Sequence, residues 1–131
     1  MMKVLHLIAV TVFGLLPVSS LCASAVDIEF VSIKKSAASW RFSVTLRHAD
    51  TGWEHYANGW RVVDKDGKVL GVRVLYHPHV NEQPFTRSHQ IAVPATVKEL
   101  YVEARDNKQG WSKNRVKIDL SKTKGDRYEI K

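Results

Sequence analysis

The chain has 131 residues, of which 44% are hydrophobic, and its 20 lysines and arginines against 13 acids give a formal net charge of +7. A single cysteine excludes an internal disulfide framework, and this length corresponds to about one domain. The basic residues are interspersed with acids instead of forming a block, so we expect no nucleic-acid partner.

Residues 1–25 have the pattern of a cleavable signal peptide. Lys3 precedes a mostly apolar run from Val4 to Leu16, and Ala23-Ser24-Ala25 is a small-x-small cleavage motif. We therefore expect a mature protein that begins at Val26 and resides in the periplasm or outside the cell. The apolar run is too short to span a membrane, and no later segment could be a span, so the mature chain is expected to have no transmembrane segment.

Cleavage there would also remove the one cysteine and both methionines, which all precede Val26. A lipidation signal has a small residue directly before its cysteine, whereas Leu21 precedes Cys22 here. We therefore expect Cys22 to be discarded with the signal peptide and not lipidated. A domain without disulfides must be stabilised by its apolar core, which about a hundred residues can supply.

Apolar and polar residues alternate through most of the remaining chain, which is typical of half-buried strands. The clearest case is the segment from Trp40 to Leu46. Seven strands are expected, at residues 27–33, 40–48, 59–63, 69–76, 85–93, 97–105 and 114–120. They predict an all-β fold, a seven-stranded immunoglobulin-like or fibronectin type III-like β-sandwich domain at 26–120. The charged C-terminal tail at 121–131 is expected to be frayed or to form a weak last strand.

The same alternation assigns side chains to the core. We expect Ile28 and Phe30 to point inward, together with a second set from the fourth strand, namely Leu70, Val72, Val74 and Tyr76. Trp40 and Trp60 are interpreted as core residues, and replacement of Trp40 by alanine is expected to be among the most destabilising changes.

The segment Val93 to Asp106, VPATVKELYVEARD, resembles the late strands of fibronectin type III-like domains. More broadly, residues 40–120, and in particular His77-Pro78-His79-Val80-Asn81-Glu82-Gln83-Pro84-Phe85-Thr86-Arg87, resemble a family of small exported bacterial immunoglobulin-like β-sandwich proteins with no assigned function. The resemblance covers most of the mature chain. It implies a fold and an exported location, and it implies no activity.

Strand direction predicts where the loops lie. Because consecutive antiparallel strands alternate in direction, the loops at 49–58, 77–84 and 106–113 should meet at one end of the sandwich. Histidines, acids and aromatic residues are frequent in these loops. A metal or ligand site is therefore expected at this end.

The sequence predicts a metal site formed by His55, His77, His79 and Glu82. Pro78 favours an extended His77, so the two imidazoles of His77-Pro78-His79 should project to one side. Imidazoles and a carboxylate, without cysteine or methionine, favour Zn(II) or Cu(II). Ordinary loop histidines are the alternative. His48 continues the inward register of its strand and is interpreted as a core-edge histidine, and Asp50, before Thr51-Gly52, as a turn residue.

A second interpretation is a module that binds an extracytoplasmic protein, peptide or glycan through Trp53, Tyr56, Arg87 and Trp111. The three aromatic residues are expected in loops, where they could instead cover the end of the core. Arg87 and His89 share the inward parity of their strand, which indicates either a bulge or a buried polar network, with Arg87 paired to Glu82. A purely structural accessory domain is the third interpretation. Since no phosphate loop or nucleophile elbow is present, we expect a non-catalytic protein.

Overall fold

In the computed structural model, Gly14 and residues 25–131 are described. Apart from Gly14 and Ala25, the predicted signal peptide, including Cys22, lies outside these residues. Within them the fold is all-β, with nine strands: β1 (Asp27–Lys34), β2 (Trp40–Arg47), β3 (Ala57–Val63), β4 (Val69–Val74), β5 (Phe85–Ile91), β6 (Glu99–Asp106), β7 (Gly110–Asp119), β8 (Lys124–Gly125) and β9 (Tyr128–Ile130). The described residues contain no helix with the length and hydrophobicity of a membrane span.

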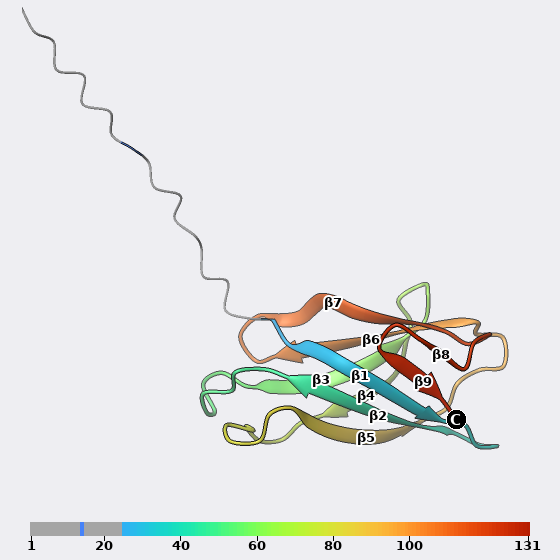
Figure 1. Cartoon of the computed structure of the whole chain (residues 1–131), viewed down its shortest axis with the longest axis horizontal. Coiled ribbons are helices and arrows are strands. Elements are labelled where there is room, and N and C mark those ends of the chain that lie inside the picture. Colours follow the sequence, from blue (N-terminus) through green and yellow to red (C-terminus); the bar gives the residue numbers. More distant parts are fainter. Residues whose placement is uncertain (1–13, 15–24) are drawn as a thin grey trace, which may run out of the picture.

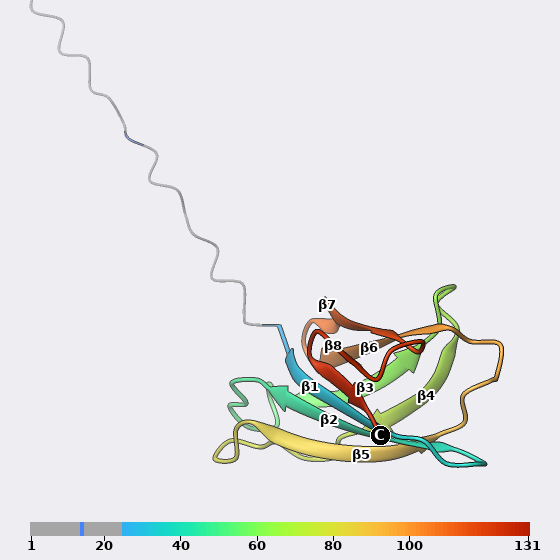
Figure 2. The same cartoon turned by 45° about the vertical axis from the view of Figure 1, so that its right-hand side comes forward.

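The strands form two sheets that pack as a sandwich (Figures 1 and 2). The five-stranded sheet has the order β5-β2-β1-β9-β8, and the four-stranded sheet has the order β4-β3-β6-β7. Buried apolar side chains from both sheets, such as Phe42 and Val44 of β2 and Val62 of β3, form one core. β1 to β7 correspond to the seven expected strands, with ends shifted by a few residues.

The C-terminal segment, expected to be frayed or to form a weak last strand, is part of the five-stranded sheet. β9 pairs in parallel with β1. The backbone amide of Lys131 donates to the carbonyl of Ile33 at 2.8 Å, and the amide of Lys35 donates to the carbonyl of Lys131 at 3.1 Å. Tyr128 is buried among the core residues. This buried side chain and the backbone pairing fix a segment whose composition alone is typical of a tail.

Two of the expected inward-facing sets are only partly right: Ile28 is buried and Leu70 packs against the core, but the other members are exposed. A register shift between Ile28 and Phe30 of β1 leaves Phe30 exposed. In β4, Val72, Val74 and the following Tyr76 are also exposed, and the buried residue is Leu75. β4 is an edge strand with only β3 beside it, so its side chains reach only the margin of the core.

The two tryptophans expected in the core differ in burial. Trp60, in the middle of the four-stranded sheet, is fully buried. Trp40, at the start of β2, is only partly buried against the core, and the ammonium group of Lys35 lies 4.8 Å from its ring centroid. The largest loss of buried aromatic surface is therefore expected at Trp60 and not at Trp40.

Candidate metal centre

The three predicted loops meet at one end of the sandwich, as the strand directions require. Asn107, after β6, donates from Nδ2 to the carbonyls of Trp53 and Glu54 at 3.0 and 3.2 Å, and its Oδ1 accepts the amide of Tyr56 at 2.9 Å. The amide of His79 donates to Asp50 Oδ2 at 2.8 Å. These bonds connect all three loops, so this part of the prediction is confirmed.

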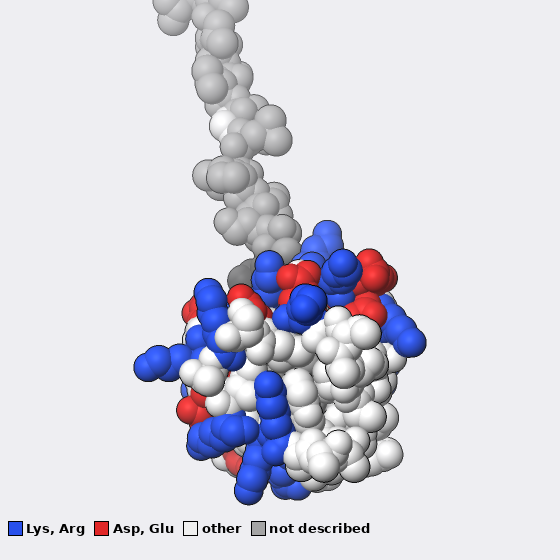
Figure 3. All heavy atoms as spheres, turned by 90° about the vertical axis from the view of Figure 1, so that its right-hand side faces the viewer, with Lys and Arg blue, Asp and Glu red and all other residues white. Residues whose placement is uncertain are grey.

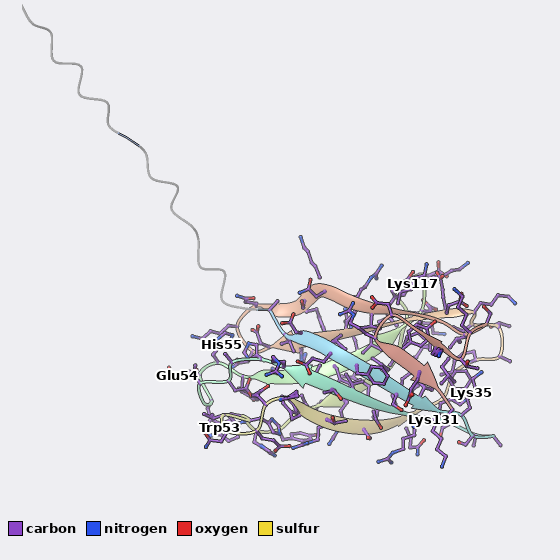
Figure 4. All side chains as sticks on the ribbon, viewed as in Figure 1. Lys35, Trp53, Glu54, His55, Lys117 and Lys131 are labelled. Atoms are coloured by element: carbon purple, nitrogen blue, oxygen red, sulfur yellow. The ribbon has the colours of Figure 1, made fainter. Side chains whose placement is uncertain are left out.

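The two ends of the sandwich differ in chemistry. Figure 4 places Trp53, Glu54 and His55 at one end and Lys35, Lys117 and Lys131 toward the other. Figure 3 views that second end and shows several lysine and arginine side chains around a broad area without charged side chains.

His48 and Asp50 extend the inward alternation of β2, and both are buried. His48 Nδ1 lies 2.6 Å from Asp50 Oδ1. The same carboxylate accepts the amide of Ala57 at 3.0 Å and that of His79 at 2.8 Å. Because an ionised carboxylate only accepts hydrogen bonds, Nδ1 carries a proton, and a neutral His48 ring would have its free lone pair at Nε2.

Asp106 approaches this nitrogen from the opposite sheet. It ends β6 and continues the inward parity of Leu100, Val102 and Ala104. Its Oδ1 accepts the amides of Lys108 at 2.8 Å and Gln109 at 2.6 Å, which closes the turn to β7. Its Oδ2 faces His48 Nε2 at 3.8 Å.

His55 completes the group from a tight turn. The amide of Thr51 donates to the carbonyl of His55, and the amide of His55 donates to the carbonyl of Gly52. Gly52 has φ 137°, a conformation that favours glycine. This turn places His55 Nε2 at 3.6 Å from Asp106 Oδ2. The rings of His48 and His55 meet edge to face, with centroids 4.7 Å apart.

One nitrogen from each histidine and one carboxylate oxygen thus converge, all within 4.8 Å of one another. The side chains of His48 and Asp106 are 0% and 1% exposed, and that of His55 is 14% exposed. Both Nε2 atoms are buried without a hydrogen-bond partner, which is a costly state for a polar atom. Ligands of a tetrahedral Zn(II) lie about 3.3 Å apart, given bonds of about 2.0–2.1 Å. The two nitrogen–oxygen distances, 3.8 and 3.6 Å, exceed that spacing by a few tenths of an ångström.

The histidines of the 77–84 loop have other neighbours. His79 is buried, stacks on Phe85 with centroids 3.9 Å apart, and accepts a hydrogen bond at Nε2 from Arg87 Nη2 at 2.8 Å. Burial, and secondarily the guanidinium of Arg87, lower the pKa of His79. His77 is exposed, and its Nδ1 donates to the carbonyl of Pro78 at 3.2 Å. A cation at His79 Nε2 would have to displace Arg87.

Arg87 also forms an ion pair with Glu82 at 3.5 Å, which confirms the predicted pairing. β5 keeps a continuous register with β2, so the expected bulge is absent there. Arg87 and His89 are only partly buried, and Arg87 contacts Glu82 and His79. Among residues 25–131, the predicted partners His77, His79 and Glu82 do not join His55 around one point. The group that converges contains His48 and Asp106 in their place.

The aromatic residues of the second interpretation are not all free. Trp111 lies in β7 and not in a loop, because the turn after β6 is shorter than expected. Its ring packs against the guanidinium groups of Arg61 and Arg105, at 3.9 and 5.0 Å from the centroid. Trp53 is 66% exposed and meets Tyr56 edge to face.

The comparisons with known proteins give one informative relative. A protein of Halomicrobium mukohataei named "Putative lipoprotein" is 37% identical over 97 residues, which are 74% of this chain and 47% of that protein. The chain thus spans about half the length of the relative that it matches. No protein-family description matches the chain, and no solved structure matches it.

Proposed function

We propose that this protein is an exported, non-catalytic β-sandwich that binds a divalent transition metal through His48, His55 and Asp106. One observation carries the proposal. Two buried imidazole nitrogens without hydrogen-bond partners face the one carboxylate oxygen of Asp106 that its turn leaves free. A metal ion bound between them would satisfy all three atoms.

Asp50 supports this function from behind His48. Histidines that bind a metal commonly donate their other ring nitrogen to a carboxylate, which fixes the tautomer and makes the ligand more basic. The 2.6 Å contact between His48 Nδ1 and Asp50 Oδ1 is of this kind. Two imidazoles and a carboxylate suit Zn(II) or Cu(II).

The exported location and the immunoglobulin-like fold belong to the same proposal. The signal-peptide pattern of residues 1–25 supports export, as does a relative named as a lipoprotein. β1, β2 and β5 share one sheet, whereas β3, β4, β6 and β7 form the other. Strands A, B and E of an immunoglobulin-like domain are likewise separated from C, F and G.

The exposed Trp53, one residue from Glu54 and two from His55, favours a second candidate function, a module that binds a protein, peptide or glycan at the same end. Trp111 and Arg87 are engaged within the domain, so Trp53 and Tyr56 would be its main contact residues. Quenching or a shift of tryptophan fluorescence in a glycan and peptide screen, lost in Trp53→Ala, would test this candidate.

The metal proposal is tested with Asp106→Asn. The asparagine Oδ1 can still accept the amides of Lys108 and Gln109, whereas the atom facing the histidines becomes an amide nitrogen that does not bind metal. Asp64→Asn is the matched control, because Asp64 Oδ1 also accepts two turn amides, of Asp66 and Lys68, far from the histidines. Calorimetry with Zn(II) and with Cu(II) uses protein purified without a histidine tag and stripped of metal.

We expect one equivalent of metal to bind the wild type and Asp64→Asn alike, and Asp106→Asn to bind at least about 100-fold more weakly, since even outer partners of a metal site contribute about 10–100-fold. Binding no tighter than millimolar in the wild type, or equal affinity in all three proteins, would contradict the proposal and favour the second candidate.

A further inference from the structure

We infer that the metal bound by His48, His55 and Asp106 keeps one exchangeable coordination position, which takes a small nitrogen or oxygen donor from solution. This inference rests on the proposed function and goes beyond it. A site closed by four protein ligands would serve as a structural staple, whereas an open position lets the metal bind a further molecule.

The first argument is the number of available ligand atoms. Among residues 25–131, three ligand atoms converge, whereas Zn(II) sites are almost always at least four-coordinate. Asp106 cannot readily supply its second oxygen, because Oδ1 accepts the amides of Lys108 and Gln109. Chelation by both oxygens would weaken the turn that positions Asp106.

The second argument concerns Asp50, the other buried carboxylate nearby. Oδ1 accepts from His48 Nδ1 and from the amide of Ala57, and Oδ2 accepts the amide of His79. It also lies on the Nδ1 side of the His48 ring, away from Nε2. Asp50 therefore orients a ligand and does not act as one.

The third argument is access. The side chains of His48 and Asp106 are almost fully buried, and that of His55 is 14% exposed. His55 is the most exposed of the three ligands, so we expect a donor from solution to reach the metal from the His55 side. This narrow approach selects small donors, such as an azide ion, a free imidazole or water, over bulky chelating ligands.

Glu54 is the nearest exposed carboxylate in sequence that could close the site instead. Its backbone carbonyl is held by Asn107 Nδ2 at 3.2 Å, and Figure 4 shows Glu54 beside His55 at the end of the molecule. The variant Glu54→Gln separates the two arrangements, because it removes this potential ligand and leaves the three inner residues unchanged.

The experiment loads the stripped protein with Co(II), which reports its coordination through visible absorption, and confirms one bound equivalent by metal analysis. Sodium azide is then titrated, and imidazole in a second series. We expect the absorption bands to shift with one-site saturation in the wild type and equally in Glu54→Gln. Cu(II)-loaded protein, followed by electron paramagnetic resonance, gives a second measurement with the other proposed class of metal.

Bound metal whose spectra respond to neither azide nor imidazole would overturn the inference and leave the proposed function standing. A response in Glu54→Gln but not in the wild type would also overturn it, and would identify Glu54 as the fourth ligand. If neither Co(II), Cu(II) nor Zn(II) binds, the proposed function itself fails, and this outcome is distinguished by the metal analysis before any donor is added.

Discussion

Two pairs of histidines lie at the same end of the sandwich, and they differ in what their ring nitrogens face. In the first pair, His48 and His55, both Nε2 atoms are buried, lack hydrogen-bond partners and point toward Asp106 Oδ2. In the second pair, His77 and His79, one ring is exposed, and the other accepts a hydrogen bond from the guanidinium of Arg87. Proximity is similar, since the ring centroids are 4.7 Å apart in the first pair and 4.6 Å apart in the second.

The difference makes the first pair better suited to hold a metal than the second, because a metal ligand needs a free lone pair and a cation is stabilised by negative charge nearby. Asp106 provides this for the first pair. Arg87 occupies the corresponding nitrogen of the second pair with a positive group, which repels a further cation. Sequence spacing alone favours His77 and His79 as metal ligands, whereas the surrounding charges favour His48 and His55.

The largest expected effect separates the two pairs directly. In His48→Gln the amide nitrogen can still donate to Asp50, but the metal ligand is lost. We expect Zn(II) affinity to fall at least about 100-fold, because a ligand contributes more than the outer partners of a site. Calorimetry and circular dichroism check affinity and folding together.

The matched comparison is the double variant His77→Gln/His79→Gln, which leaves His48, His55 and Asp106 in place. We expect it to bind Zn(II) within a few-fold of the wild type. The reverse result, with binding lost in the double variant and kept in His48→Gln, would support the site predicted from sequence and contradict the site formed with Asp106.

A smaller effect is expected at Asp50, a buried carboxylate that contacts both pairs. Its carboxylate accepts from the His48 ring and from the backbone of His79. In Asp50→Asn one oxygen becomes a donor, so a buried donor loses its acceptor, at a cost of about 1–3 kcal/mol in the free energy of unfolding. Zn(II) affinity should also fall, by about 10–100-fold.

Urea unfolding of the metal-free protein and calorimetry separate the two effects. Asp119→Asn, which lies outside the three end loops, serves as a control for the loss of a carboxylate. If Asp50→Asn loses stability but binds Zn(II) with wild-type affinity, Asp50 stabilises the loops and does not support the metal ligand.

Much of the fold could be predicted because period-two alternation is a local signal. It located β1 to β7, and alternating strand direction then placed the three loops at one end. The outward face of β4 and the pairing of β9 with β1 were not predictable in this way, because they depend on which strands lie at a sheet edge. Composition likewise gave no sign that Tyr128 is buried.

Part of the site was also visible in the sequence. His48 and Asp106 each extend the inward parity of a strand, so both could be expected to point into the end of the core. That they face each other could not be predicted, since β2 and β6 belong to different sheets and no local pattern sets how two sheets pack. Likewise, no local pattern predicts that Arg87 donates to His79, because Arg87 lies eight residues away in β5.

The smallest expected effect concerns the pH dependence of the second pair. Burial, then Arg87 and then His77 lower the pKa of His79, against the opposing charges of Glu82 and Asp50. Below its ordinary value of about 6.5 the unfolded chain binds a proton at this residue that the folded protein resists. The free energy of unfolding should therefore fall as the pH drops below about 6.5, until His79 is protonated in the folded state as well.

His79→Gln removes this contribution, and its side-chain oxygen can still accept from Arg87. Urea midpoints of both metal-free proteins at about pH 7.5 and about pH 5.5 isolate it, because the other groups titrate in both. The wild type should lose more stability than the variant over this interval. An equal loss would mean that protonated His79 fits the folded protein as well as neutral His79 does, and the contrast in charge between the two pairs would no longer hold.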